Sequence, residues 1–154
     1  MRFVLAVVGK PRDASLASAI AEYERRAARY WPLHVVEVRE EPARGMNEAQ
    51  VRERETARLV EALPAGGQVI ACDVGGRTMT SEAFAALMQQ QREAARDVGL
   101  VIGGAYGLAD SLRDRASVRL ALAPWTLPHE LARLVLAEQL YRAGTIIRGE
   151  PYHK

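Results

Sequence analysis

The chain has 154 residues, of which 49% are hydrophobic and 26% charged, the composition of a soluble globular protein of one domain. Its net charge of +2 excludes the strong basic excess that is typical of proteins binding nucleic acid by charge alone. The single cysteine, Cys72, excludes an internal disulfide framework and predicts a cytoplasmic location. No apolar run reaches the roughly 18 to 20 residues that span a bilayer, so no membrane partner is expected.

The first half of the chain predicts two strands and two helices in alternation. Residues 2–8 predict a buried strand, because their apolar run is too short for a signal peptide and Lys10 and Arg12 follow at once. Periodic apolar residues predict a helix over 15–30, a Val-rich strand over 34–38 and a helix over 47–63. Asn47 and Gln50 are spaced to close a capping box at the start of this second helix.

The second half continues the alternation. A strand over 69–73 is predicted to end in a turn at Gly75 and Gly76, and Thr80 or Ser81 caps a helix that runs to about residue 95. The remaining predicted elements are a strand over 100–102, a short helix over 111–115, a strand over 118–122 and a helix over 129–146. This order predicts a single α/β domain over residues 1–154, with a mostly parallel sheet and helices on both of its faces.

In such a sheet, ligands bind beyond the carboxyl ends of the strands. Three loops are therefore candidates: the loop after Asp73, residues 103–107 and residues 123–128. Glycines at 103, 104 and 107 let a ligand approach the backbone, although a tight turn explains them as well. Trp125 suits a wall of a pocket for an adenine-sized ring, and core packing explains it equally well. The dinucleotide fingerprint and the P-loop are both missing from the sequence.

The last predicted helix is apolar around nearly its whole circumference. A helix of this kind must be buried on nearly all sides, and a domain of this size covers only one side with its own sheet. We therefore predict a homodimer built on this helix, with a core helix covered by an irregular loop as the alternative. Glu138 and Arg142 lie four residues apart within it, which predicts an ion pair that either supports the structure or orients a substrate.

Few other classes of chemistry have support in the sequence. The three histidines are far apart and Cys72 has no cysteine partner, so no metal is expected. Nucleophilic serine chemistry lacks its strand-to-helix motif. Glu22, Arg25, Arg26 and Arg29 share one face of the first helix, which is either a solvated face or a surface that contacts phosphates. Group transfer that depends on positioning is the reaction type that remains.

The chain ends in Pro151-Tyr152-His153-Lys154, a rigid residue, a phenol, an imidazole and an ammonium in succession. Terminal residues are usually frayed and tolerant of change, and a solvated end is one interpretation of this tail. Because the tail directly follows the apolar helix and its Glu138–Arg142 pair, the other interpretation is a part of an active site.

Four ordered motifs resemble the ribosomal RNA large subunit methyltransferase H family of the SPOUT class. They are Leu100-Val101-Ile102-Gly103-Gly104-x-x-Gly107-Leu108, Thr126-Leu127-Pro128-His129, Ala137-Glu138-Gln139-Leu140-Tyr141-Arg142-Ala143 and Pro151-Tyr152-His153-Lys154. The resemblance covers the whole chain and implies a C-terminal trefoil knot, a homodimer and bound S-adenosylmethionine. It also implies N3 methylation of a pseudouridine in 23S rRNA within the assembled ribosome.

The resemblance also implies roles for individual residues. The residues that it places around the cofactor are Cys72, Gly103, Gly104, Leu122, Ala123, Pro124, Trp125, Thr126 and Leu127. Those that it places around the acceptor base are His129, Glu138, Arg142, Tyr152 and His153. Either histidine, or solvent, removes the N3 proton in the expected reaction. A nucleotide-dependent oxidoreductase and a ribosome-associated binding protein without catalysis are the alternative functions.

Overall fold

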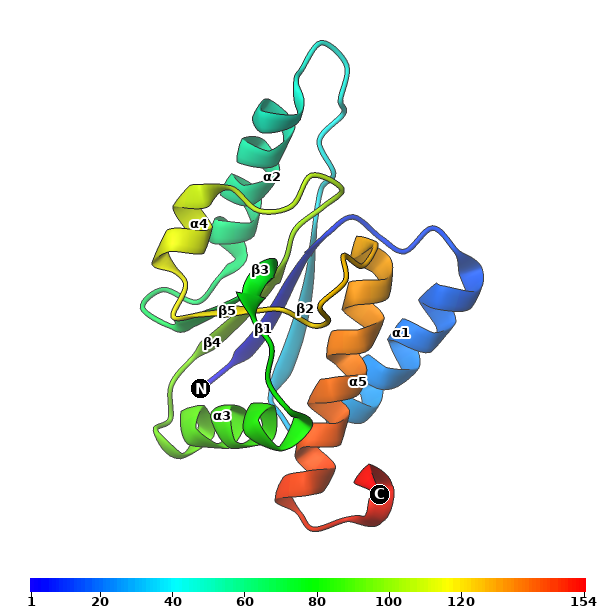
Figure 1. Cartoon of the computed structure of the whole chain (residues 1–154), viewed down its shortest axis with the longest axis vertical. Helices are drawn as coiled ribbons and strands as arrows, with labels where there is room; N and C mark the ends of the chain where they lie inside the picture. Colours follow the sequence, from blue (N-terminus) through cyan, green and yellow to red (C-terminus); the bar gives the residue numbers. More distant parts are fainter.

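The computed structural model describes residues 1–154 and shows strands alternating with helices (Figure 1). The elements are β1 (Phe3–Val8), α1 (Ala14–Ala27), β2 (Leu33–Val38), α2 (Glu48–Ala62), β3 (Gln68–Arg77), α3 (Ser81–Glu93), β4 (Val98–Ile102), α4 (Asp110–Arg115), β5 (Val118–Leu120), α5 (His129–Ile147) and the 3-10 turn η1 (Pro151–His153). All the predicted strands and helices are present. None of the helices combines the length and the apolar character that a membrane-spanning helix needs.

The five strands form one sheet in the order β2-β1-β4-β3-β5, and every neighbouring pair is parallel. This arrangement confirms the predicted α/β class. Because all strands run the same way, the carboxyl ends of β3, β4 and β5 lie at one edge of the sheet. The trefoil knot implied by the resemblance stays a prediction.

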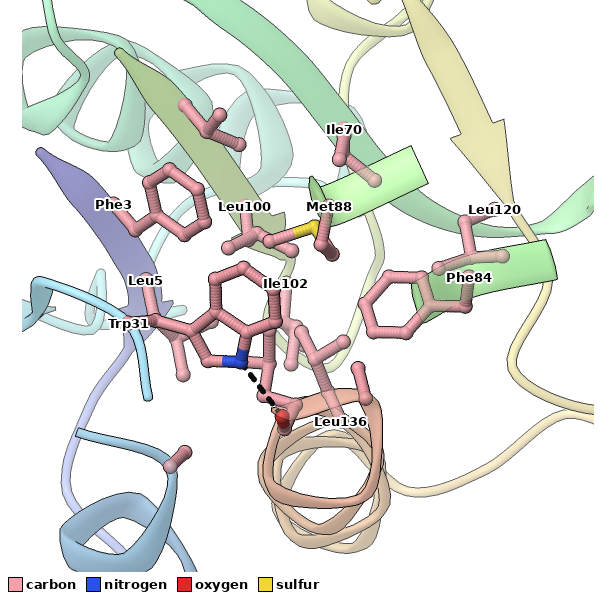
Figure 2. Close-up of a cluster of buried hydrophobic side chains, with 14 of the residues drawn as sticks. Phe3, Leu5, Trp31, Ile70, Phe84, Met88, Leu100, Ile102, Leu120 and Leu136 are labelled. Atoms are coloured by element: carbon pink, nitrogen blue, oxygen red, sulfur yellow. Dashed lines mark hydrogen bonds between the residues drawn. The ribbon is translucent and has the colours of Figure 1, made fainter. Parts of the chain in front are cut away.

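Alternate residues of the central strands supply two separate cores, one on each face of the sheet. Phe3 and Leu5 of β1 and Leu100 of β4 face α1, α3 and α5, whereas Ala6 and Val101 face α2 and α4. Figure 2 shows the larger core, in which the Trp31 indole N–H donates to the backbone oxygen of Leu140 at 2.8 Å. Helices therefore cover both faces, as predicted.

The capping residues predicted at the starts of α2 and α3 form the expected hydrogen bonds. Asn47 accepts from the Gln50 N–H while the Gln50 side chain accepts from the Asn47 N–H, which is the predicted capping box. Thr80 caps α3 by accepting from the Ala83 N–H, which resolves the choice between Thr80 and Ser81.

The turn predicted at Gly75 and Gly76 is wrong, because β3 continues through both glycines to Arg77. A Cβ on Gly76 would lie 2.5 Å from the backbone oxygen of Arg119. This glycine therefore permits the close approach of β3 to β5 and does not mark a turn. β5 also ends two residues earlier than predicted, at Leu120, and the chain beyond it lines a cavity.

Helix α5 packs beside α1 and α3, and Figure 1 shows α1 and α5 running side by side. A Cβ on Gly144 would lie 2.2 Å from the Tyr30 ring, so this glycine lets Tyr30, just after α1, pack directly against α5. The opposite side of α5 carries Leu131, Leu134 and Val135, which are only half-buried. This partly uncovered apolar side is the surface on which the predicted homodimer depends.

Candidate active site

A cavity of about 590 Å³ opens beyond the carboxyl ends of β4 and β5 and beside residues 72–74 of β3, where β3 stops pairing with β4, next to the start of α5. We call it the main cavity. It lies where open α/β sheets bind their ligands, and it brings together all three predicted loops. His129 lines it, and so do eight of the nine predicted cofactor residues. These eight are Cys72, Gly103, Gly104, Leu122, Ala123, Trp125, Thr126 and Leu127.

The glycine loop that follows β4 forms one wall of the main cavity. A Cβ on Gly103 would lie 2.6 Å from the carbonyl carbon of Gly107, and a Cβ on Gly104 would lie 2.6 Å from Glu55 Oε1. Gly107 has a φ of +77°, a conformation that favours glycine. The loop is therefore a tight turn and a cavity wall at once, so the two interpretations of its glycines are compatible.

The loop after β5 forms the opposite wall. Trp125 is 78% exposed at the edge of the main cavity, so core packing is the wrong explanation for this residue. An exposed indole beside an apolar cavity is free to pack on a bound ring. Pro124 is exposed and does not line the cavity, and it is the only predicted cofactor residue that the structure leaves outside.

Asp73 lines the main cavity and was missed by the sequence interpretation, although the loop that follows it was singled out. Its carboxylate accepts from Arg119 Nη2 at 2.5 Å and lies 3.8 Å from Arg113 Nη1. Its position at the end of a predicted strand was the available signal. Among the residues lining this cavity Asp73 is the one carboxylate, which makes it the natural acceptor for hydroxyl or ammonium groups of a ligand.

Cys72 also lines the main cavity, but its thiol is unreactive. Burial, followed by the nearby Asp73 charge, raises the pKa of the Cys72 thiol to about 12. Since the thiolate is the nucleophilic form, this cysteine stays protonated at neutral pH and serves for packing.

Four side chains, three from α5 and one from η1, form a second group, which we call the tail cluster: Glu138, Tyr141, Arg142 and Tyr152. Arg142 donates to Glu138 Oε1 from Nε at 3.0 Å and from Nη2 at 2.6 Å, which confirms the predicted pair. The Tyr152 hydroxyl donates to the same oxygen at 2.9 Å. The Tyr152 ring lies 4.5 Å from that of Tyr141, and the Arg142 guanidinium lies 4.9 Å from the Tyr152 ring.

These contacts tie the tail to α5. A second anchor comes from the Tyr30 hydroxyl, which donates to Glu150 at 2.5 Å. Burial, with the Glu138 contact adding to it, raises the pKa of the Tyr152 phenol, so Tyr152 remains a hydrogen-bond donor and not a base near neutral pH. His153 is exposed and forms no hydrogen bond or ion pair within the chain, which leaves its imidazole free for a ligand.

One chain does not bring all five predicted acceptor residues together. His129 begins α5 and lines the main cavity, whereas Glu138, Arg142, Tyr152 and His153 do not line it. Nine residues separate His129 from Glu138 along the helix, which is about 13 Å at a rise of roughly 1.5 Å per residue. The predicted site therefore lies in two parts, one at the start of α5 and one beside its second half and the tail.

The predicted charged face of α1 is largely neutralised within the chain. Glu22 accepts from Arg26 Nε at 2.7 Å and also pairs with Arg25. Arg26 further lies over the ring of Tyr141, 5.6 Å from its centre. Arg29 is the exposed member without an ion pair, which favours the solvated face over a phosphate-binding surface. No group of three or more His, Cys, Asp or Glu side chains is arranged to hold a metal ion.

Glu55 is a second residue that the sequence interpretation missed. It lies on α2 behind the glycine loop, only 2% exposed, and its Oε2 accepts from the Glu41 N–H at 3.0 Å. Its Oε1 is buried without a hydrogen-bond partner and lies against Gly104. Burial raises the pKa of the Glu55 carboxyl, and the nearby Glu40 charge adds to this rise. No sequence pattern distinguished Glu55 from the other charged residues of its helix, which are typical of a solvent-exposed face.

Replacing Glu55 by Gln is expected to change how stability depends on pH. The unfolded carboxyl titrates near 4.5 and the folded one at higher pH. The wild type therefore has its full stability below pH 4.5 and loses part of it as the pH rises through the folded pKa, whereas Glu55→Gln does not. Urea unfolding at pH 4.5, 6 and 7.5 measures the free energy of unfolding of both proteins, and we expect the difference to shift in favour of Glu55→Gln as the pH rises.

The control is Glu53→Gln, an exposed position on the same helix. Its stability relative to the wild type is expected to stay within about 0.5 kcal/mol at each pH. Parallel pH profiles for the wild type and Glu55→Gln would show that burial does not penalise the Glu55 carboxylate.

Known proteins resemble this chain over its whole length. The family described as "Predicted SPOUT methyltransferase" matches residues 1–153. Ribosomal RNA large subunit methyltransferase H of Gemmatimonas aurantiaca is 64% identical over 154 residues, with 100% of both chains covered. The proteins of the same name from Anaeromyxobacter sp. (strain Fw109-5) and Syntrophotalea carbinolica are 48% and 44% identical, with 100% and 99% of both chains covered.

Solved structures share the fold at low sequence identity. TrmJ from Z. mobilis ZM4 superimposes with a TM-score of 0.53 at 17% identity, over 93% of this chain and 70% of that one. A protein described as "a probable methylase family protein" from Haemophilus influenzae Rd KW20 gives a TM-score of 0.52 at 13% identity, over 99% and 70% of the two chains. The full-length identities with the curated relatives show that the chain belongs to the ribosomal RNA large subunit methyltransferase H family of SPOUT methyltransferases.

Proposed function

We propose that the protein transfers a methyl group from S-adenosylmethionine to N3 of a pseudouridine in 23S rRNA of the assembled ribosome. The observation that carries this proposal is full-length identity of 64% to a ribosomal RNA large subunit methyltransferase H, combined with a main cavity built from the expected loops. A ribosomal substrate places the enzyme in the cytoplasm. We further propose that residues 1–154 act as one domain.

The residues of the main cavity fit S-adenosylmethionine. Its walls are the apolar loop from Leu122 to Leu127 and a glycine loop that a Cβ at Gly103 would fill. Apolar walls with exposed backbone groups suit an adenine ring, and the Asp73 carboxylate suits the hydroxyl or ammonium groups. When bound, S-adenosylmethionine supplies an electrophilic methyl group. We assign cofactor contact to the eight predicted residues that line the cavity and a rigidifying role to Pro124.

The acceptor nitrogen becomes nucleophilic as its proton leaves, so the site must handle one proton and the charge that develops on the flanking carbonyl oxygens. His129 lines the main cavity and His153 carries a free imidazole, so either accepts the proton in this proposal. Arg142 stabilises the developing negative charge. Tyr152 keeps its proton and donates a hydrogen bond or stacks on the base. Glu138 holds both of these side chains in place.

We propose that a homodimer assembles these groups. The half-buried apolar side of α5 provides the interface, and the tail cluster of one subunit completes the main cavity of the other. The separation of His129 from the tail cluster along α5 supports this arrangement, because His129 lines the main cavity of its own chain and the tail cluster does not.

Methyl transfer from cofactor labelled in its methyl group tests the function. Assembled ribosomes, separate subunits and free 23S rRNA serve as acceptors, and the modified nucleotide is mapped. Label at N3 of one pseudouridine, strongest in assembled ribosomes, is the expected result. Absence of label from every acceptor, despite measurable binding of S-adenosylmethionine by calorimetry, would contradict the proposal and favour a binding protein without catalysis.

A further inference from the structure

A second cavity, of about 390 Å³, lies behind the glycine loop, and we call it the β2–α2 cavity. Arg12 of the β1–α1 loop, Ala43 of the β2–α2 segment, Glu55 of α2 and Tyr106 of the glycine loop line it. Ala105 lines both this cavity and the main cavity. The two cavities therefore share one loop as a dividing wall, and a ligand in the second lies directly beside the first.

The acidic side chains of the β2–α2 cavity are already neutralised or held within the chain. Glu40 pairs with Arg12 at 2.5 Å, and Glu41 pairs with Arg54 and Arg58. Glu55 is held by the Glu41 N–H and is buried. Arginines therefore offset the charges of Glu40 and Glu41, whereas the buried Glu55 carboxyl lies against Gly104 at the back of the cavity.

The surroundings of the cavity carry positive charge that nothing in the chain neutralises. Arg39, Arg44 and Arg52 form no ion pair, and each is a sequence neighbour or a contact of a residue lining the cavity. Lys10 also forms no ion pair and lies two residues before Arg12 in the β1–α1 loop. Arg52, for example, donates to the Tyr106 backbone oxygen at 3.4 Å. The α1 face differs, since two of its three arginines already pair with Glu22. Free cations thus gather around the β2–α2 cavity and not on α1.

An aromatic ring completes the arrangement. Tyr106 is 37% exposed and lines the cavity at the tip of the glycine loop. Exposed aromatic rings flanked by basic side chains are typical of surfaces that bind unpaired RNA, where the bases stack on the rings and the phosphates meet the cations. A lipid surface or an acidic peptide would need the cations but not a hollow with a ring in its wall.

We propose that the β2–α2 cavity holds an unstacked nucleotide of the RNA substrate that flanks the methylated base. Its base lies against Tyr106, and the neighbouring phosphates contact Lys10 and Arg44. This inference rests on the proposed function and adds to it a binding subsite that lies outside the methyl-transfer centre. Because the subsite and the main cavity share the glycine loop, the bound RNA is held against the wall of the site where transfer takes place.

Variants that leave the main cavity intact test the subsite. Lys10 and Arg44 are exposed and form no side-chain hydrogen bond or ion pair, so Lys10→Gln/Arg44→Gln is expected to fold as the wild type does. We expect this double variant to raise the KM for assembled ribosomes and to reduce the slope of log KM against log salt by about 0.7–0.9 for each lost phosphate contact. Tyr106→Ala is expected to raise that KM by about tenfold, while Tyr106→Phe keeps it near the wild-type value. The kcat and the Kd for S-adenosylmethionine are expected to stay within about twofold.

The matched control is Arg96→Gln, an exposed arginine without an ion pair in the turn before β4. A second readout replaces Tyr106 with p-benzoylphenylalanine and irradiates the complex with ribosomes. Crosslinks to 23S rRNA near the methylated nucleotide would support the subsite. Crosslinks to a ribosomal protein, or an unchanged KM in both Tyr106→Ala and the double variant, would overturn it. A wild-type protein that methylates no RNA would instead contradict the proposed function.

Discussion

Deleting residues 152–154 is expected to abolish methyl transfer while leaving the fold and cofactor binding largely intact. The deletion removes the Tyr152 ring from Tyr141 and Arg142, and the Tyr152 hydroxyl from Glu138. Arg142 is then no longer fixed from both sides, and His153 is lost. Misplacement of catalytic groups by about 1 Å costs roughly 10²-fold, so we expect kcat/KM to fall by at least that factor.

The tail lies outside both cores, so its loss costs about 1–2 kcal/mol of the free energy of unfolding. Calorimetry is expected to give a Kd for S-adenosylmethionine within about twofold of the wild type, because no tail residue lines the main cavity. Deletion of Lys154 alone is the control and should leave the rate nearly unchanged. A truncated enzyme that retains a wild-type rate in single turnover would show that the tail has no part in the reaction.

Replacing Gly103 by Ala is expected to weaken cofactor binding severely. The new Cβ would lie 2.6 Å from the carbonyl carbon and 2.7 Å from the oxygen of Gly107, both backbone atoms that cannot move aside alone. The loop must open at the Gly104–Gly107 bridge, which reshapes the wall of the main cavity. Overpacking typically costs about 1–3 kcal/mol, so calorimetry should show the Kd for S-adenosylmethionine raised by about ten- to hundredfold.

Gly75→Ala provides a control close to the same cavity. Its Cβ would meet only the end of the flexible Arg119 side chain at 3.2 Å, which can move away. We expect cofactor binding within about threefold of the wild type for this variant. If Gly103→Ala bound S-adenosylmethionine as tightly as Gly75→Ala does, the glycine loop would not be a cofactor wall.

The fold was predictable wherever local signals and burial agree. The first strand is buried at every position, and the capping box at Asn47 and Gln50 depends on residues three apart, so both were visible in sequence. The turn at Gly75 and Gly76 was wrong because its cause is not local. Gly76 is a glycine so that β3 can pass the Arg119 backbone, a contact between residues far apart in the chain.

The site was predictable in its loops and not in its supporting residues. The motifs and the resemblance indicated eight residues that line the main cavity, and the four-residue spacing indicated the Glu138–Arg142 pair. Glu55 and Asp73 were not predicted from the sequence. Glu55 matters because it is buried, and Asp73 because it pairs with Arg119, which is far away in the sequence. Spacing likewise could not show that His129 lines the main cavity while the tail cluster lies outside it.

Two copies of the chain share each active site in this proposal, and a mixture of two impaired variants tests the sharing when the cofactor concentration is kept far below the Kd of Gly103→Ala. The chain truncated after Pro151 keeps an intact main cavity, and Gly103→Ala keeps an intact tail cluster. Subunits are exchanged by denaturing and refolding the two variants together. In a random mixture half of the dimers are mixed, and each of these has one complete site, so activity should return to about a quarter of the wild-type value. Mixed dimers that form but transfer no methyl group would contradict the shared site.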